Sequence, residues 1–231
     1  MPIFRLTESL VFPSPHYAEP DGLLAVGGDL SPQRLLVAYA LGIFPWYSDY
    51  TPILWWSPHP RLVLFPDEFR ISASLRRVVK KKAFTVTVDR CFREVMQECA
   101  QVPRRYGEGT WITEEMLDAY CRLHRLGYAH SVESWQAGEL VGGLYGVALG
   151  RAFFGESMFM RKTDASKVAL VHLVYLLRRF GFEFVDCQVT TAHLQRFGAR
   201  EIPREDFLGI LREAVAKGGL PGSWASTPLE E

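Results

Sequence analysis

The sequence predicts an α+β protein built on a mixed sheet, and three observations lead to this prediction. Segments with strand and helix patterns alternate through most of the 231 residues. Three predicted strands between residues 130 and 159 are separated only by short turns that contain glycine, which is typical of an antiparallel meander. The segment 153–188 then reads strand, helix, strand, and this order predicts a right-handed crossover between two parallel neighbouring strands.

Three polar side chains lie on the strands of this crossover. Glu156 interrupts the apolar strand 153–159, and Asp186 and Gln188 lie two residues apart in the strand 184–189. Because side chains alternate along a strand, we expect Asp186 and Gln188 on one face, with Glu156 nearby on the neighbouring strand. Buried charge is costly without a partner, so these residues indicate a site of chemistry. The other interpretation is a polar network that only ties the strands together.

Composition and length exclude several classes of protein. The apolar fraction of 48% and the charged fraction of 23% are ordinary for a soluble globular protein. No apolar run approaches the ~18–20 residues of a membrane-spanning helix, and the N-terminus lacks the pattern of a signal peptide, so we expect a cytoplasmic protein without a membrane partner. The four cysteines and six histidines show no metal-ligand spacing. We therefore expect reduced thiols and no metal site.

The net charge of zero hides an uneven distribution. Residues 61–105 carry 11 lysines and arginines against five acidic residues. A helix predicted at 71–82 places its basic residues on an outer face, namely Arg76, Arg77, Lys80, Lys81 and Lys82. Such a face attracts a polyanion, or it is only a solvated helix surface. The sequence leaves both interpretations open.

The first sixty residues predict a small separate domain. After a proline-rich opening, a short strand is predicted at 23–26, and Ser31 as N-cap before Pro32 predicts a helix that Gly42 ends. Loops marked by proline then hold three of the six tryptophans: Trp46, Trp55 and Trp56. Tryptophans in such loops fill a core or offer flat surfaces on which bases stack. We predict a small N-terminal α+β domain at 1–62 and a second domain at 63–231.

The remaining elements follow in a regular order. A strand at 84–88 leads into a helix with Asp89 as its predicted cap, then a polar loop at 103–110 leads to Trp111, and Thr113 caps the next helix. The meander, the crossover, a short helix, a strand and a last helix from Pro203 follow. This order is that of the GCN5-related N-acetyltransferase fold, which binds an acyl donor between two splayed parallel strands.

Short motifs along most of the chain resemble those of one enzyme family. In order they are Gly27-Gly28-Asp29-Leu30, Gly42-Ile43-Phe44-Pro45-Trp46, Trp55-Trp56-Ser57-Pro58, Gly109-Thr110-Trp111-Ile112-Thr113, His130-Ser131-Val132-Glu133, Gly142-Gly143-Leu144-Tyr145-Gly146, Gly155-Glu156-Ser157-Met158-Phe159, Ala165-Ser166-Lys167 and Asp186-Cys187-Gln188. Together they are similar to the leucyl/phenylalanyl-tRNA–protein transferases from about Gly22 to Phe207. The tail after Pro221 is less informative.

The resemblance implies a bacterial cytoplasmic aminoacyltransferase that needs no cofactor. Such an enzyme transfers Leu or Phe, and to a lesser extent Met, from aminoacyl-tRNA to the α-amine of proteins with N-terminal Arg or Lys. Its partners are therefore Leu-tRNA or Phe-tRNA as donor and a protein or peptide as acceptor. The product carries an N-degron for protein degradation. The family combines a small N-terminal domain with an acetyltransferase-like domain.

The resemblance also implies roles for particular residues. The catalytic group carries over as Glu156, Asp186 and Gln188, and the contacts to the 3′-terminal adenosine as Trp46, Trp111 and Tyr120. Asp186 would orient and deprotonate the acceptor amine, directly or through Gln188, although Gln188 is also suited to donate to the oxyanion. Glu156 would hold the cationic amine of either substrate.

The donor side chain requires an apolar pocket sized for Leu or Phe. Its expected lining comes from the meander, the crossover strands and the inner face of the helix: Leu144, Phe153, Leu170, Leu173, Leu177 and Val185. Each of these residues singly is as well explained as ordinary core. The basic helix 71–82 is expected to contact phosphates of the tRNA without reading its sequence.

Two other functions remain open at this point. An acyl-CoA-dependent N-acyltransferase would cradle pyrophosphate with a glycine-rich loop before the crossover helix. The loop 159–166 has no glycine and places an acid at the helix start, which counts against CoA. A non-catalytic module that binds RNA or peptide would leave the three converging polar residues without a purpose, and an assay for turnover separates it from an enzyme.

Overall fold

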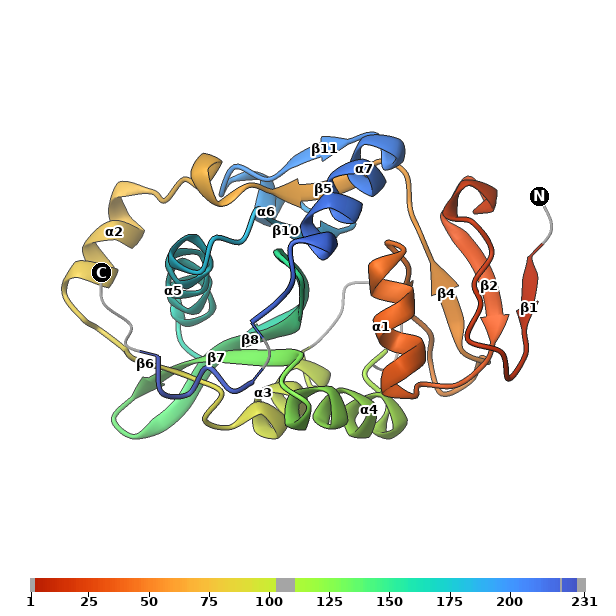
Figure 1. Ribbon diagram of the computed structural model, residues 1–231. Helices are drawn as coiled ribbons and strands as arrows, with labels where there is room; N and C mark the ends of the chain where they lie inside the picture. Colours follow the sequence, from red (N-terminus) through yellow and green to blue (C-terminus); the bar gives the residue numbers. More distant parts are fainter. Residues whose placement is uncertain (1–2, 103–110, 221, 228–231) are drawn as a thin grey trace.

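The computed structural model describes residues 3–102, 111–220 and 222–227, and it contains two sheets (Figure 1). The smaller sheet has the strand order β1-β2-β4-β3, and the larger has the order β11-β5-β10-β9-β8-β7-β6. The polar loop predicted at 103–110 lies outside the described residues. Within the described part, no helix has the length and apolar character needed to cross a membrane.

The smaller sheet and one helix form the N-terminal part. The strands are β1 (Phe4–Leu6), β2 (Leu23–Gly27), β3 (Phe44–Pro45) and β4 (Leu54–Trp56), and the helix is α1 (Pro32–Ala40). Strand β1 runs parallel to β2, whereas β4 is antiparallel to both β2 and β3. The Ser31 hydroxyl accepts a hydrogen bond from the backbone N–H of Arg34, which confirms the predicted helix cap. Trp55 is fully buried and therefore fills the core.

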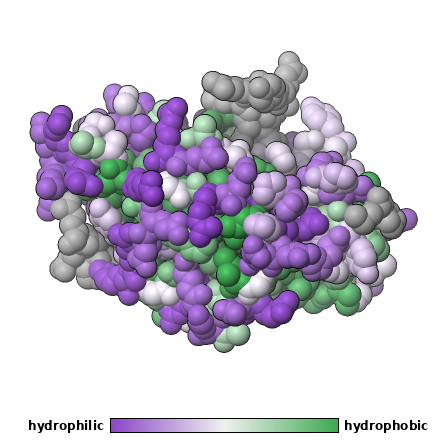
Figure 2. All heavy atoms as spheres, turned by 90° about the horizontal axis from the view of Figure 1, so that it is seen from above, coloured by the Kyte–Doolittle hydropathy of each residue, from purple (hydrophilic) through white to green (hydrophobic). Residues whose placement is uncertain are grey.

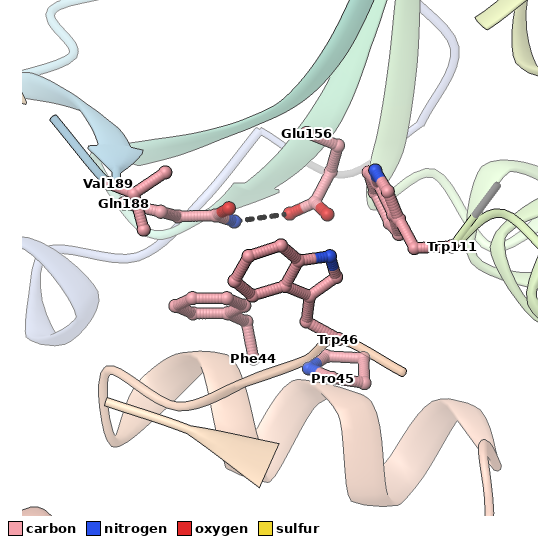
Figure 3. A pocket seen from close by; sticks show the side chains of 7 residues that line it. All are labelled: Phe44, Pro45, Trp46, Trp111, Glu156, Gln188 and Val189. Carbon is pink, nitrogen blue, oxygen red and sulfur yellow. Dashed lines mark hydrogen bonds between the residues drawn. The ribbon is translucent and has the colours of Figure 1, made fainter. Parts of the chain in front are cut away.

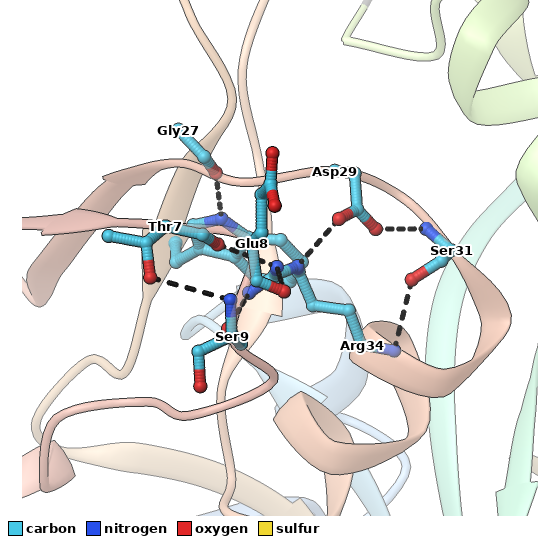
Figure 4. A network of polar contacts seen from close by, with 8 residues as sticks. Thr7, Glu8, Ser9, Gly27, Asp29, Ser31 and Arg34 are labelled. Carbon is cyan, nitrogen blue, oxygen red and sulfur yellow. Dashed lines mark hydrogen bonds and ion pairs between the residues drawn. The ribbon is translucent and has the colours of Figure 1, made fainter.

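A buried arginine ties the start of the chain to this part (Figure 4). The guanidinium of Arg34 donates to the backbone carbonyls of Thr7 and Ser9 at 2.8 and 3.1 Å, and to the Asp29 carboxylate at 3.2 Å. Its side chain has no exposed surface. Three convergent acceptors satisfy the donors that burial removes from water. The proline-rich opening is thereby held against α1.

The larger sheet contains the predicted meander and crossover. Its strands are β5 (Arg61–Leu64), β6 (Thr85–Val88), β7 (Ala129–Gln136), β8 (Glu139–Leu149), β9 (Ala152–Met160), β10 (Phe184–Gln188) and β11 (Arg200–Ile202). Strands β7, β8 and β9 pair antiparallel, and β9 pairs parallel with β10, as predicted. Strand β5 was not predicted. It lies between β10 and β11 and is antiparallel to both.

Helices cover both faces of this sheet (Figure 1). They are α2 (Ala73–Lys80), α3 (Phe92–Ala100), α4 (Glu114–Arg125), α5 (Ala165–Arg179), α6 (Ala192–Gln195) and α7 (Arg204–Ala216). Helix α5 packs on the face that carries Leu144, Phe153 and Val185. Helices α3 and α4 share a core with Tyr145 and Phe154, whose side chains point to the opposite face because strand residues alternate.

The predicted cap of α3 is wrong. The N-cap position is Cys91, and no side chain caps the helix. The Asp89 carboxylate instead accepts hydrogen bonds from the backbone N–H groups of Ser131 and Trp224, at 3.0 and 2.7 Å, and contacts Nδ1 of His130 at 2.9 Å. The indole of Trp224 stacks on His130 with 3.7 Å between ring centroids. Asp89 therefore anchors the C-terminal segment to the larger sheet.

The two parts meet without a long linker. The predicted boundary between residues 62 and 63 falls inside β5, so the domain limits stay a proposal. Figure 2 views the side on which β11, β5 and α7 lie, and shows a mainly hydrophilic surface with a hydrophobic strip near its middle. The contacts that α1 makes with α4, α7 and β8 hold the N-terminal part against the larger sheet.

Candidate active site

Glu156 lies where the two parts of the chain meet. The residue belongs to β9, and its side chain accepts hydrogen bonds from three residues that are remote in sequence, two of which lie on α1 and α4. The hydroxyl of Tyr39 donates to Oε1 at 2.8 Å, that of Tyr120 donates to Oε2 at 3.4 Å, and the amide of Gln188 donates to Oε1 at 3.0 Å. All three groups donate, so the carboxyl group is held as a hydrogen-bond acceptor.

The surroundings of Glu156 change its acidity. Burial raises the pKa of Glu156 to about 7, and the nearby charge of Asp186 acts in the same direction. The hydrogen bonds from Tyr39, Gln188 and Tyr120 oppose this rise because they favour the charged form. A carboxyl group with a pKa near 7 exchanges protons at neutral pH and is therefore suited to general acid–base catalysis.

Gln188 reaches Glu156 because β10 is irregular at its end. The register with β5 shifts between Asp186 and Gln188, and Gln188 has a left-handed backbone with a φ of 61°. The Asp186 carboxylate accepts a hydrogen bond from the backbone N–H of Gln188 at 2.9 Å. This contact fixes the bulge, and the bulge directs the amide of Gln188 to Glu156.

Asp186 itself is occupied by an arginine. The Arg61 guanidinium donates to both carboxylate oxygens, through Nε at 2.8 Å and Nη2 at 2.7 Å. The Asp186 side chain has no exposed surface, and that of Arg61 is 1% exposed. The three predicted catalytic residues therefore converge only in part. Glu156 and Gln188 touch each other and line two pockets, whereas Asp186 lies behind Gln188 and lines neither of them.

An aromatic pocket opens in front of Glu156. Its volume is about 110 Å³, and it is lined by Phe44, Pro45, Trp46, Trp111, Glu156, Gln188 and Val189. Figure 3 shows the Glu156 carboxylate between the Gln188 amide and the Trp111 indole, with Trp46 across the pocket. Trp46 is 44% exposed, so one indole is accessible to a ligand. The structure thus brings together the two tryptophans predicted as adenosine contacts.

Tyr120, predicted as a contact to the 3′-terminal adenosine, does not line the aromatic pocket, and that contact stays a prediction. The residue has no exposed surface, and its hydroxyl is shared between Tyr39 and Glu156. Burial and the Glu156 carboxylate hold the pKa values of both tyrosines well above their ordinary range, so both stay protonated. A base cannot stack on a ring that the core covers. Tyr120 supports Glu156, and Tyr39 was not predicted at all because nothing in its helix marks it.

An aliphatic pocket continues from the same point. Its volume is about 330 Å³, and it shares Glu156, Gln188 and Val189 with the aromatic pocket. Five of the six predicted lining residues border it: Leu144, Phe153, Leu170, Leu173 and Val185. Leu177 does not line it and is fully buried among core residues. The lining that was not predicted includes Leu64 from β5 and Leu194 from α6.

Three further predictions concern the basic helix, the cysteines and metal binding. The five basic residues at α2 and its end are exposed, namely Arg76, Arg77, Lys80, Lys81 and Lys82. All four cysteines are free thiols. Among the described residues, no group of three or more His, Cys, Asp or Glu side chains is arranged to hold a metal ion.

Comparison of the sequence with known proteins identifies one enzyme family. The family model described as leucyl/phenylalanyl-tRNA protein transferase matches residues 63–212, and the model of its N-terminal domain matches residues 28–59. The leucyl/phenylalanyl-tRNA–protein transferase of Syntrophobacter fumaroxidans is 67% identical over 224 residues, which cover 97% of this chain and 96% of that protein. Those of Anaeromyxobacter sp. strain Fw109-5 and Desulfatibacillum aliphaticivorans are 59% and 56% identical, each over 97% of this chain and over 95% and 97% of their own lengths.

Similarity to solved structures is weaker. The structure of L-PGS from Bacillus licheniformis aligns with a TM-score of 0.38 and 16% sequence identity. The alignment covers 73% of this chain and 54% of that chain.

The raised pKa of Glu156 predicts how stability varies with pH. A native carboxyl group that keeps its proton up to about pH 7, and releases it near 4.5 when unfolded, stabilises the fold below about pH 4.5. This contribution is lost as the pH rises through 7. We therefore expect the unfolding free energy of the native protein, relative to Glu156→Gln, to fall between pH 5 and 7 and to level off above. Urea unfolding at several pH values measures it, with the exposed hairpin variant Glu139→Gln as control. A constant difference would contradict the raised pKa.

Proposed function

Since the chain belongs to the leucyl/phenylalanyl-tRNA protein transferase family, we propose that Glu156, Gln188 and the two pockets beside them form the centre at which its reaction takes place. The chain is an aminoacyltransferase that transfers Leu or Phe from aminoacyl-tRNA to proteins with N-terminal Arg or Lys. The observation that carries the placement is the position of a carboxyl group with a pKa of about 7 between an aliphatic and an aromatic pocket.

The proposed binding mode follows from the two pockets. The donor side chain enters the aliphatic pocket, whose volume of about 330 Å³ accommodates either Leu or Phe. The terminal adenosine lies in the aromatic pocket between Trp46 and Trp111, because unpaired bases stack on aromatic side chains. The ester that joins the two groups then lies beside the residues that both pockets share, Glu156 and Gln188. An apolar pocket discriminates weakly, by about 1–3 kcal/mol per methylene, which suits the use of more than one donor.

The proposed chemistry is aminolysis of the donor ester. The α-amine of the acceptor attacks the ester carbonyl, and its proton passes to the Glu156 carboxylate as the tetrahedral intermediate forms. When the C–O bond to the ribose breaks, the same proton passes to the leaving ribose oxygen. Because free α-amines have pKa values of about 7.7–8.0, a base with a pKa of about 7 is well matched to this transfer. Gln188 uses one amide hydrogen for Glu156 and keeps the other for the oxyanion.

Asp186 is proposed as a positioning residue rather than as the base. Both of its carboxylate oxygens accept from Arg61, and one also accepts from the backbone N–H of Gln188. Both oxygens are engaged by these donors, and the side chain lines neither pocket, so the acceptor amine does not reach it. Its contribution is the bulge that directs Gln188 to Glu156.

Three further features of the family are proposed for this chain. The basic residues of α2 contact phosphates of the tRNA through their exposed side chains. The reaction takes place in the cytoplasm, where aminoacyl-tRNA is present. The Leu or Phe that is added then serves as an N-degron.

The central experiment is a transfer assay with Phe-tRNA and a peptide that begins with Arg. We expect transfer to the free peptide and none to the same peptide with an acetylated N-terminus, because the acetyl group removes the nucleophile. The rate should rise with pH through about 7 as Glu156 ionises. Glu156→Gln should lower the rate by about 10²-fold and remove this step, so that only the ionisation of the acceptor amine, at about 7.7–8.0, still raises the rate with pH. A variant that keeps the native rate and pH profile would exclude Glu156 as the base.

A second experiment separates positioning from base catalysis at Asp186. Asp186→Asn leaves the buried Arg61 without its counter-charge, so we expect a loss of about 3–5 kcal/mol of unfolding free energy. The double variant Arg61→Met/Asp186→Leu should recover most of that loss because no charge stays buried. In a positioning role, the Asp186→Asn protein that remains folded has a lower rate but keeps the pH step near 7. Loss of the pH step would instead identify Asp186 as the base.

A third experiment tests the aromatic pocket. Trp111→Ala should weaken donor binding by about 1–3 kcal/mol, the usual loss for one stacked base, and Trp111→Phe should recover part of it. Aminoacyl-adenosine should show the same loss as the full tRNA, since the contact is to the terminal base. Tyr50→Ala serves as control, because Tyr50 is 93% exposed and lies outside the pocket. Reduced thermal stability with unchanged donor binding would show that Trp111 only fills the core.

A further inference from the structure

A third hollow, the basic pocket, adjoins the aliphatic pocket at the end away from the aromatic pocket. Its volume is about 610 Å³, and it lies between the end of β9, the start of α5, α6 and the end of α3. Its lining includes Glu98, Arg161, Ser166, Lys167, His193 and Arg196. It shares Met158 and His193 with the aliphatic pocket. No residue of this pocket has a role in the proposed aminolysis of the donor ester.

The lining of the basic pocket carries an excess of positive charge. Three cationic side chains line it against one carboxylate, that of Glu98. Arg161 pairs with Glu98, and Lys167 pairs with Asp164 at 2.7 Å. The guanidinium of Arg196 has no acidic partner within the part of the chain that the structure describes. One full cationic charge is therefore left for a ligand.

Two further donors point to the same place. No residue that the structure describes forms a hydrogen bond with Nε2 of His193, and burial, Lys167 and Arg196 together lower the pKa of this histidine. Both cations therefore lie close to its ring. Ser166, the second residue of α5, also lines the pocket and carries a hydroxyl that can donate to an anion.

We propose that the basic pocket binds a phosphate group in the unpaired 3′ end of the donor tRNA, an inference that rests on the proposed function. The positive lining attracts the polyanionic donor and repels an acceptor whose first residue is Arg or Lys. Along β9, the distance from Glu156 to Met160 is about 13 Å at the usual rise per residue. A strand of a few unpaired nucleotides bridges this distance from an adenosine held beside Glu156.

The test compares two donors that differ only in their phosphates. Arg196→Ala should lower kcat/KM for Phe-tRNA by roughly three- to tenfold at low salt, as expected for loss of a charge-assisted contact, and Lys167→Gln should lower it less because Lys167 also pairs with Asp164. The salt dependence should flatten by about 0.7 in log–log slope per lost phosphate contact to a single strand. Transfer from phenylalanyl-adenosine, which has no phosphate, should be unchanged. Arg212→Ala is the matched control, because it removes an exposed arginine on α7 outside the pocket.

The other outcomes overturn the proposal in distinct ways. Equal losses with both donors would place these residues in the chemistry or the fold, and melting temperatures distinguish those two causes. A higher KM for the peptide with an unchanged KM for the donor would assign the pocket to the acceptor. Variants that match the native protein with both donors would leave the pocket without a phosphate. Failure of the native protein to transfer from either donor would reject the proposed function itself.

Discussion

The geometry of the site depends on one buried ion pair, between Arg61 and Asp186. Arg61 begins β5, the strand that joins the two parts of the chain, and its guanidinium lies 5.0 and 4.5 Å from the ring centres of Phe44 and Phe207. Asp186, held in place by Arg61, accepts a hydrogen bond from the backbone N–H of Gln188 and so fixes the end of β10. Breaking a buried pair is costly because the remaining charge has no water around it. The pair therefore fixes the bulge, and with it the side chain that meets Glu156.

The crossover could be predicted because its signals are local. Apolar strands on each side of a long helix dictate parallel pairing of β9 and β10, and that pairing puts Glu156 and Gln188 at the same end of neighbouring strands. The aliphatic pocket followed in the same way, since Leu144, Phe153 and Val185 share one face of the sheet. Motif resemblance supplied the two tryptophans, and the structure brings them together although they come from loops 65 positions apart.

The rest depended on contacts between distant residues. Nothing near Asp186 indicates that Arg61 neutralises it, and nothing near Glu156 indicates that Tyr39 and Tyr120 donate to it. The left-handed backbone of Gln188 was also hidden, because glutamine seldom adopts a positive φ. The sequence signal of strand β5 could have been recognised, since Leu62, Val63, Leu64 and Phe65 form a short apolar run that Pro66 ends.

The hydrogen bond from Tyr39 to Glu156 lets the N-terminal part influence the pKa of a residue in the larger sheet. The hydroxyl belongs to α1, whereas the carboxyl group belongs to the larger sheet, so the first forty residues help to set the protonation of a group far along the sequence. A chimaera that took its N-terminal part from a relative without a hydroxyl at position 39 would have a less acidic Glu156. If Glu156 is the base, as proposed, the pH at which such a chimaera works would shift upward although the larger part was unaltered. The smaller part therefore contributes to the pKa of Glu156, and exchanging it between relatives would change that pKa without any change in the larger part.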